Sequence, residues 1–125
     1  MSRLPDALLA HLRDPRNVGQ APGGQTHRGE ARNAACRDHL VLSLRVEGGQ
    51  VVSAGFKAAG CPATLGMGSA VTELLPGLEC GPGLAEGLRS RFIDAYGEPA
   101  ALHRHALAMV AEALGSLAGA DGEPG

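Results

Sequence analysis

The feature that most constrains the fold is a stretch of alternating residues followed by a glycine turn. Alternate positions from Leu40 to Val46 carry aliphatic side chains, with the period of a strand that buries one face. Paired glycines follow in Glu47-Gly48-Gly49-Gln50, and glycine accepts the positive φ angles of a tight hairpin turn. A second apolar stretch covers residues 51–58. The sequence therefore predicts two antiparallel strands joined by this turn.

Helical patterns surround the predicted hairpin. The helices are expected at residues 4–13, 62–75, 83–95 and from near Pro99 to Leu117. Proline stands at the first position of the second of these helices, and Pro76-Gly77 closes it, as is typical of helix ends. The segment 17–29 is rich in Gly, Pro, Gln and Asn and predicts a surface loop or a weak edge strand. We expect one domain at residues 1–118 and a disordered tail at 119–125.

Composition excludes several kinds of partner. Aromatic residues make up 2% of the chain, too few for a platform that stacks nucleic-acid bases, and the net charge is −2 with both signs interspersed. We therefore expect neither nucleic acid nor membrane as a partner, and residues 1–12 are too short and polar for a signal peptide or a span. Three cysteines, an odd number, favour metal-binding or reactive thiols in the cytoplasm over a disulfide framework.

Two cysteines mark the predicted outer ends of the two strands. Cys36 lies just before the first strand, with Asp38 two residues later, and Cys61 follows the second strand at the start of a helix. Strand pairing would bring these residues together, and a helix start favours the thiolate form of cysteine. Thiolates, a carboxylate and a histidine are ligands that suit zinc or iron.

The histidine of this set would come from the last helix. His103 and His105 are about 200° apart on a helix, so only one can face the site. We favour His103 because it shares a face with the apolar Leu107, Val110 and Leu114.

Each residue also has a purely structural interpretation. A cysteine is commonly a small buried apolar residue, Asp38 could cap a turn, and His103 could be a hydrogen-bonded core residue. Cys80 is expected to be structural, since the helix at 62–75 is about 20 Å long and separates it from Cys61. The spacing alone therefore leaves the metal site open.

Four motifs in collinear order resemble those of the iron–sulfur cluster assembly scaffolds of the IscU/NifU N-terminal type. They are Asp14-Pro15-Arg16-Asn17-Val18-Gly19, Ala35-Cys36-Arg37-Asp38, Phe56-Lys57-Ala58-Ala59-Gly60-Cys61, and Leu102-His103-Arg104-His105-Ala106-Leu107-Ala108. The resemblance covers about residues 13–117. It implies an α+β fold of the SufE/NifU-like kind, with a small three-stranded antiparallel sheet and helices packed on it. It also implies a non-enzymatic scaffold that takes sulfur from a cysteine desulfurase, holds a transient [2Fe–2S] cluster or zinc, and passes the cluster to carrier or acceptor apoproteins.

The chain departs from the family at three places. Arg104 occupies the position of the family's third cysteine, which is also a sulfur acceptor, and a guanidinium cannot ligate a metal. Arg37 replaces a glycine beside Cys36, and the segment that engages a chaperone in some scaffolds is reduced to Glu98-Pro99-Ala100-Ala101. Sulfur acceptance and the chaperone partner are therefore in doubt.

The remaining set is Cys36, Asp38, Cys61 and His103, which offers two sulfurs, one oxygen and one nitrogen. It predicts a scaffold-like protein, a monomer or weak homodimer, that binds iron, a [2Fe–2S] cluster or zinc. A second hypothesis is a zinc-stabilised interaction protein that docks on the cluster-assembly partners. A third, a thiol enzyme with Cys61 as nucleophile and His103 as base, lacks any sequence signature of an oxyanion hole.

Overall fold

The computed structural model describes residues 10–11, 13–33, 37–99 and 101–119, without the side chains of 101–103, 118 and 119. Its elements are β1 (His27–Asn33), β2 (Asp38–Glu47), β3 (Gln50–Ala59), α2 (Pro62–Leu74), α3 (Leu84–Tyr96), α4 (Ala101–Gly115) and β4 (Ala118–Gly119). Ala10, His11 and Arg13 are helical, at the end of the helix predicted for 4–13; the rest of that prediction lies outside the described residues.

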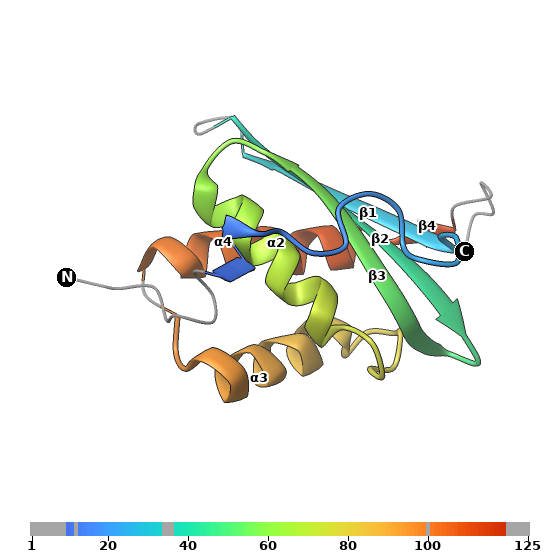
Figure 1. Ribbon diagram of the computed structural model, residues 1–125. Coiled ribbons are helices and arrows are strands. Elements are labelled where there is room, and N and C mark those ends of the chain that lie inside the picture. Colours follow the sequence, from blue (N-terminus) through green and yellow to red (C-terminus); the bar gives the residue numbers. More distant parts are fainter. Residues whose placement is uncertain (1–9, 12, 34–36, 100, 120–125) are drawn as a thin grey trace.

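The sheet has the strand order β3-β2-β1-β4, and each neighbouring pair is antiparallel (Figure 1). The predicted hairpin is confirmed: β2 and β3 are joined at Gly48 and Gly49, whose φ angles are 60° and 80°. With β1 these strands form the expected three-stranded antiparallel sheet, and the two residues of β4 extend it beside β1. Gly119, placed in the predicted tail, thus pairs with His27, while residues 120–125 lie outside the described part of the chain.

The third strand was only partly predicted. Residues 27–29 fall in the segment expected to be a loop or weak edge strand, yet β1 pairs along its whole length with β2. The core-facing side chains of β1 are small because α4 lies very close to it. A Cβ at Gly29 would overlap the carbonyl group of Ala113 on α4. The close helix explains why β1 lacks the bulky alternating residues that mark β2.

The helices form two layers on one face of the sheet. α2 packs on β3, α4 packs on β1 and β2, and α3 packs against both of these helices. The core between them is aliphatic with two phenylalanines, Phe56 and Phe92, each 1% exposed. Close approach again requires glycine, because a Cβ at Gly68 on α2 would overlap the Phe56 ring.

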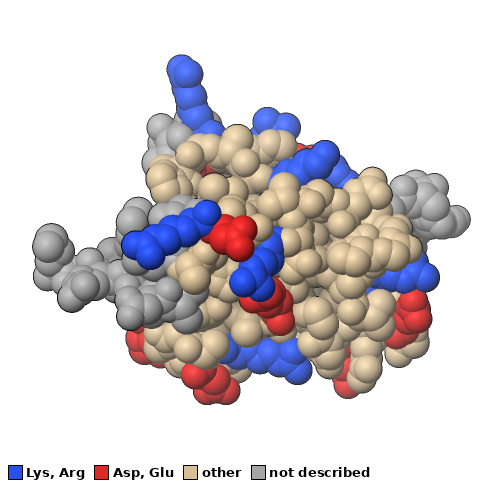
Figure 2. Space-filling view, viewed as in Figure 1, with Lys and Arg blue, Asp and Glu red and all other residues tan. Residues whose placement is uncertain are grey.

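Helix ends follow the predictions from sequence. α2 begins with Pro62 at its first turn, where proline needs no hydrogen-bond partner, and α3 ends at Gly97 with φ at 88°. The predicted bounds of α2, α3 and α4 agree with the structure to within a few residues. Figure 2 shows side chains of both charges side by side on the face seen in Figure 1, in keeping with the small net charge.

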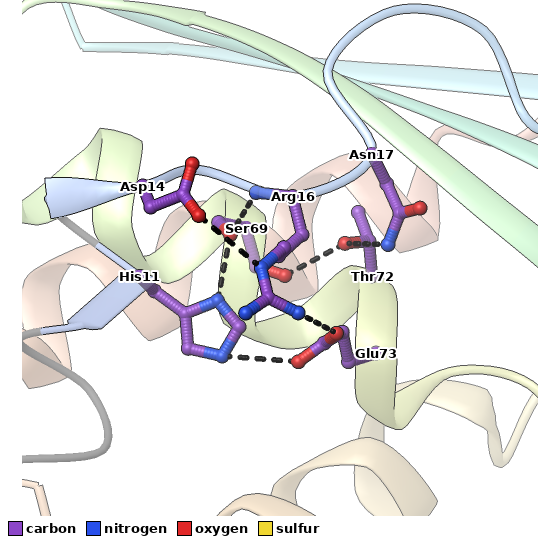
Figure 3. Close-up of polar contacts among 7 residues, drawn as sticks. All are labelled: His11, Asp14, Arg16, Asn17, Ser69, Thr72 and Glu73. Carbon is purple, nitrogen blue, oxygen red and sulfur yellow. Dashed lines mark hydrogen bonds and ion pairs between the residues drawn. The ribbon is translucent and has the colours of Figure 1, made fainter.

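The segment 14–21, called the strap below, leads from the N-terminal residues to the edge of β3. Polar contacts fix its start to α2 (Figure 3). The backbone N–H of Arg16 donates to Ser69 Oγ at 2.7 Å, and the same hydroxyl lies 2.7 Å from His11 Nδ1. Asn17 Nδ2 donates to Thr72 Oγ1 at 3.1 Å. Buried hydroxyl groups of α2 thus obtain their partners from the strap and the residues before it.

Candidate functional site

The candidate site lies where β2 begins and β3 ends. The pairing of His39 with Ala59 brings Asp38, at the start of β2, to Cys61, the residue that caps the N-terminus of α2. The backbone N–H of Cys61 donates to Asp38 Oδ1 at 2.7 Å. The predicted convergence of the two strand ends is therefore confirmed for Asp38 and Cys61.

Asp38 is a buried carboxylate that connects three elements. Its side chain is 0% exposed, and its second oxygen, Oδ2, lies 3.3 Å from both Thr64 Oγ1 on α2 and His105 Nε2 on α4. The Cys61 N–H lowers the pKa of Asp38 and outweighs the opposing effect of burial, with further lowering by the Cys61 thiol, His105 and Thr64. The group is thus a carboxylate at neutral pH, and its charge lies at the start of α2.

Gly60 makes this contact possible. Its φ is 112°, in a region that residues with a side chain rarely adopt, and a Cβ there would overlap Asp38 Oδ1. The residue before Cys61 therefore has to be glycine for Asp38 to reach the Cys61 N–H. The sequence contained the signal, a glycine between a strand and a helix.

His105, the alternative to His103, is the histidine that contacts the described site. It is half-buried, and its Nε2 also lies 3.2 Å from Asn33 Nδ2 at the end of β1. The argument for His103 rested on a face with Leu107, Val110 and Leu114, and those residues are buried. Met109, on the face of His105, is buried as well, because α4 packs on the sheet with that side too. Burial thus does not separate the two histidines.

Cys36 and the side chain of His103 lie outside the described residues, so their part in the metal site stays a prediction. Among the residues that are described, no three His, Cys, Asp or Glu side chains form a group that could hold a metal ion. Asp38 and Cys61 are therefore the two predicted ligands whose proximity the structure establishes.

The other singled-out residues lie elsewhere. Cys80 donates its backbone N–H to Gly49 O at 2.8 Å, at the hairpin end of the sheet, which confirms that it is remote from Cys61. Burial raises the pKa of the Cys80 thiol. Arg104 is exposed on α4, and Arg37 has a φ of 56°, a value that explains why glycine suits this position. Thr64 and Asn33, which sequence reasoning missed, have no motif that would have marked them.

No helix in the described part of the chain is long and apolar enough to span a membrane.

Comparisons with known proteins place this geometry in a family. The model of the NifU-like N terminal domain matches residues 4–112. The bifunctional protein NifU/MnmA of Rubrobacter xylanophilus is 39% identical over 93 residues, which cover 74% of this chain and 19% of that protein. The iron-sulfur cluster assembly protein IscU of Plasmodium falciparum is 32% identical over 74 residues, 58% of this chain and 46% of that protein. The chain thus spans less than half the length of these relatives.

Solved structures agree on the fold. The N-terminal part of a nitrogen-fixing NifU-like protein from Brucella abortus superposes with a TM-score of 0.63 at 16% identity, covering 88% of this chain and 90% of that one. A putative iron-sulfur cluster assembly scaffold protein from Fervidobacterium islandicum gives 0.60 at 13% identity, with 88% and 95% covered. Sheet, helices and sequence match together show that the chain belongs to the NifU-like N-terminal domain family of iron–sulfur cluster assembly scaffolds.

Proposed function

We propose that this chain binds iron or a transient [2Fe–2S] cluster, or zinc, at the site end of the sheet, through Cys36, Asp38, Cys61 and a histidine of α4. The supporting observation is the Asp38 carboxylate, whose Oδ1 bonds to the Cys61 N–H at 2.7 Å. Its Oδ2 has only longer contacts of 3.3 Å, which a metal could replace while Oδ1 keeps its bond. His103 remains the favoured histidine ligand from the sequence, with His105 as the alternative.

The family supplies the cargo and the partners in this proposal. Relatives are named as iron–sulfur cluster assembly proteins, so a cysteine desulfurase and cluster acceptors are the expected partners. The prediction of a cytoplasmic, non-enzymatic protein extends the same reasoning.

Arg104 is the residue that sets this chain apart within the proposal. No described carboxylate lies within ion-pair distance of it, so its charge is available to anionic groups, including thiolates or a negatively charged cluster. Since it cannot carry a persulfide, we propose that sulfur acceptance is weakened while metal binding is retained. Arg104→Cys should then increase persulfide formation on incubation with a desulfurase and cysteine, measured by mass spectrometry. An unchanged persulfide yield would show that position 104 does not limit sulfur acceptance.

The experiment that tests the site is anaerobic reconstitution with ferrous iron and sulfide, in parallel with zinc titration. Cys61→Ser should lose the visible absorbance of the cluster and weaken zinc binding at least tenfold, whereas Cys80→Ser, the matched control at the other end of the sheet, should retain both. Equal behaviour of the two variants, or a folded wild-type protein that takes up neither metal, would refute the proposal.

The second candidate is a zinc-stabilised interaction protein that docks on cluster-assembly partners without building clusters, and Arg104 favours it. A structural zinc ion contributes its binding free energy to folding, so a chelator should then lower the unfolding temperature of the purified protein. A cluster carrier would instead give up its metal with its fold intact.

A further inference from the structure

The edge of β3 next to Cys61 has backbone groups with no partner within the described structure. Phe56 N–H donates to Asn17 O at 3.0 Å, and Phe56 O accepts from Gly19 N–H at 2.7 Å, so both groups of Phe56 point away from β2. The pattern alternates along an antiparallel strand, so the N–H and C=O of Ala58, two residues on, point the same way. The strap pairs with this edge beside Phe56 and has no recorded hydrogen bond to Ala58.

The open edge borders an apolar depression beside Cys61. Its lining residues are Ala58, Ala59, Gly60, Cys61, Pro62 and Leu65. None of them carries a formal charge, and all except Leu65 have small or compact side chains. An uncharged extended segment could therefore pair with Ala58 and place a side chain against α2 without burying an unpaired charge.

The strap shows that this edge accepts an additional chain. The bridge between Val18 and Phe56 is parallel, so the chain's own residues already extend the sheet by one short strand. Bare sheet edges are normally protected against pairing, and β3 is protected beside Phe56 and Val51 by the strap and by residues 77 and 78. The unprotected stretch is the one that leads to Cys61.

We infer that the edge of β3 at Ala58 receives an extended, uncharged segment of a partner protein and thereby directs that segment's cysteine to Cys61. The inference rests on the proposed function, because it assigns to Cys61 the exchange of sulfur with partners. Main-chain pairing supplies the affinity in this mode of recognition, and the depression at Leu65 accommodates one side chain of the segment. Cys61 lies three residues beyond Ala58, about 10 Å of extended chain. A cysteine in the paired segment could thus come close to the Cys61 sulfur.

The chemistry of the encounter is thiol exchange. The Cys61 thiolate attacks the sulfur of the partner's cysteine when that sulfur is bonded to another sulfur. The old S–S bond breaks, its other sulfur leaves as a thiolate, and a new S–S bond joins Cys61 to the segment. No external oxidant or reductant is consumed.

The test uses a blocked hexapeptide of Val, Thr and Cys whose cysteine carries thionitrobenzoate as the leaving group. Glutathione with the same leaving group is the unpaired comparison, and mass spectrometry resolves the reaction at Cys61 from that at Cys80. We expect the hexapeptide to modify Cys61 about tenfold faster than glutathione does, the gain that one or two backbone hydrogen bonds would give. At Cys80, the internal control, the two reagents should react alike.

Two changes should remove the advantage at Cys61. Ala58→Pro eliminates the outward N–H at an edge position where proline is tolerated, and it should leave the glutathione rate unchanged. N-methylation of the hexapeptide tests the same contact on the wild-type chain: blocking one residue should abolish the advantage, and blocking its neighbour should not. Equal rates for the two reagents, or insensitivity to both changes, would overturn the inference. The assay contains no metal, so its outcome is separate from that of cluster reconstitution.

Discussion

Gly60→Ala should be one of the most damaging single-methyl additions in the chain. Alanine at a φ of 112° is strained by about 1–3 kcal/mol, and its Cβ would overlap Asp38 Oδ1. If Asp38 withdraws, its hydrogen bond to the Cys61 N–H is lost, which costs about 1.5–3 kcal/mol for a bond to a charged acceptor. The expected fall in the free energy of unfolding is about 3–5 kcal/mol, measured by urea denaturation at neutral pH.

Gly97→Ala is the matched control for this prediction. Gly97 has a φ of 88°, so alanine is strained there too, but nothing lies within 4 Å of its Cβ position. It should lose only the conformational part, about 1–3 kcal/mol. In an Asp38→Ala background, Gly60→Ala should fall to the cost of Gly97→Ala, because the overlapping carboxylate has gone. Equal costs for the two alanines in the wild-type background would refute the role of Gly60 in positioning Asp38.

Three further predictions follow from buried contacts. Asp38 has a folded pKa below its ordinary value of 3.8, so its stabilisation is present above that pH and is lost as the pH falls through the folded pKa; the difference in unfolding free energy between wild type and Asp38→Asn should shrink from pH 7 to pH 3, and a pH-independent difference would contradict this. Gly68→Ala should lower stability by about 1–3 kcal/mol in urea denaturation, because its Cβ overlaps the buried Phe56 ring, and a neutral result would show that the ring can move aside. Ser69→Ala should cost about 1–3 kcal/mol by leaving two buried nitrogen groups without their hydroxyl partner, whereas the exposed Ser90→Ala should be neutral; a cost at Ser69 no larger than at Ser90 would mean that the strap is not fixed by this hydroxyl.

The parts of the fold that sequence predicted are those with a local signal. The alternation in β2, the paired glycines at 48 and 49 and the proline at the start of α2 each report on their own conformation, and each prediction is confirmed. β1 was incompletely predicted because its small core-facing residues answer to α4, which is some eighty residues distant in the chain. Long-range packing of this kind leaves no period in the sequence.

The site divides along the same line. Strand pairing is enough to bring Asp38 to Cys61, so their proximity could be predicted from the hairpin alone. The histidine could not be chosen this way, because both sides of α4 are buried to some degree and the contact of His105 with Asp38 depends on how the helix is rotated on the sheet. Thr64 is hidden for a similar reason: a threonine in the first turn of a helix has many roles, and only the fold shows its hydroxyl on Asp38.

The two ends of the sheet are held by different forces, and this difference bears on function. At the hairpin end, backbone bonds such as that from Cys80 to Gly49 and the apolar Leu75 and Leu78 fix the structure. At the site end, one buried carboxylate joins β2, α2 and α4, and two of its contacts are as long as 3.3 Å. Contacts of that length can be exchanged for a metal at little cost, whereas an apolar core cannot open without losing its packing. A protein that has to take up and release its cargo can therefore change its site end while the aliphatic core and the hairpin stay folded.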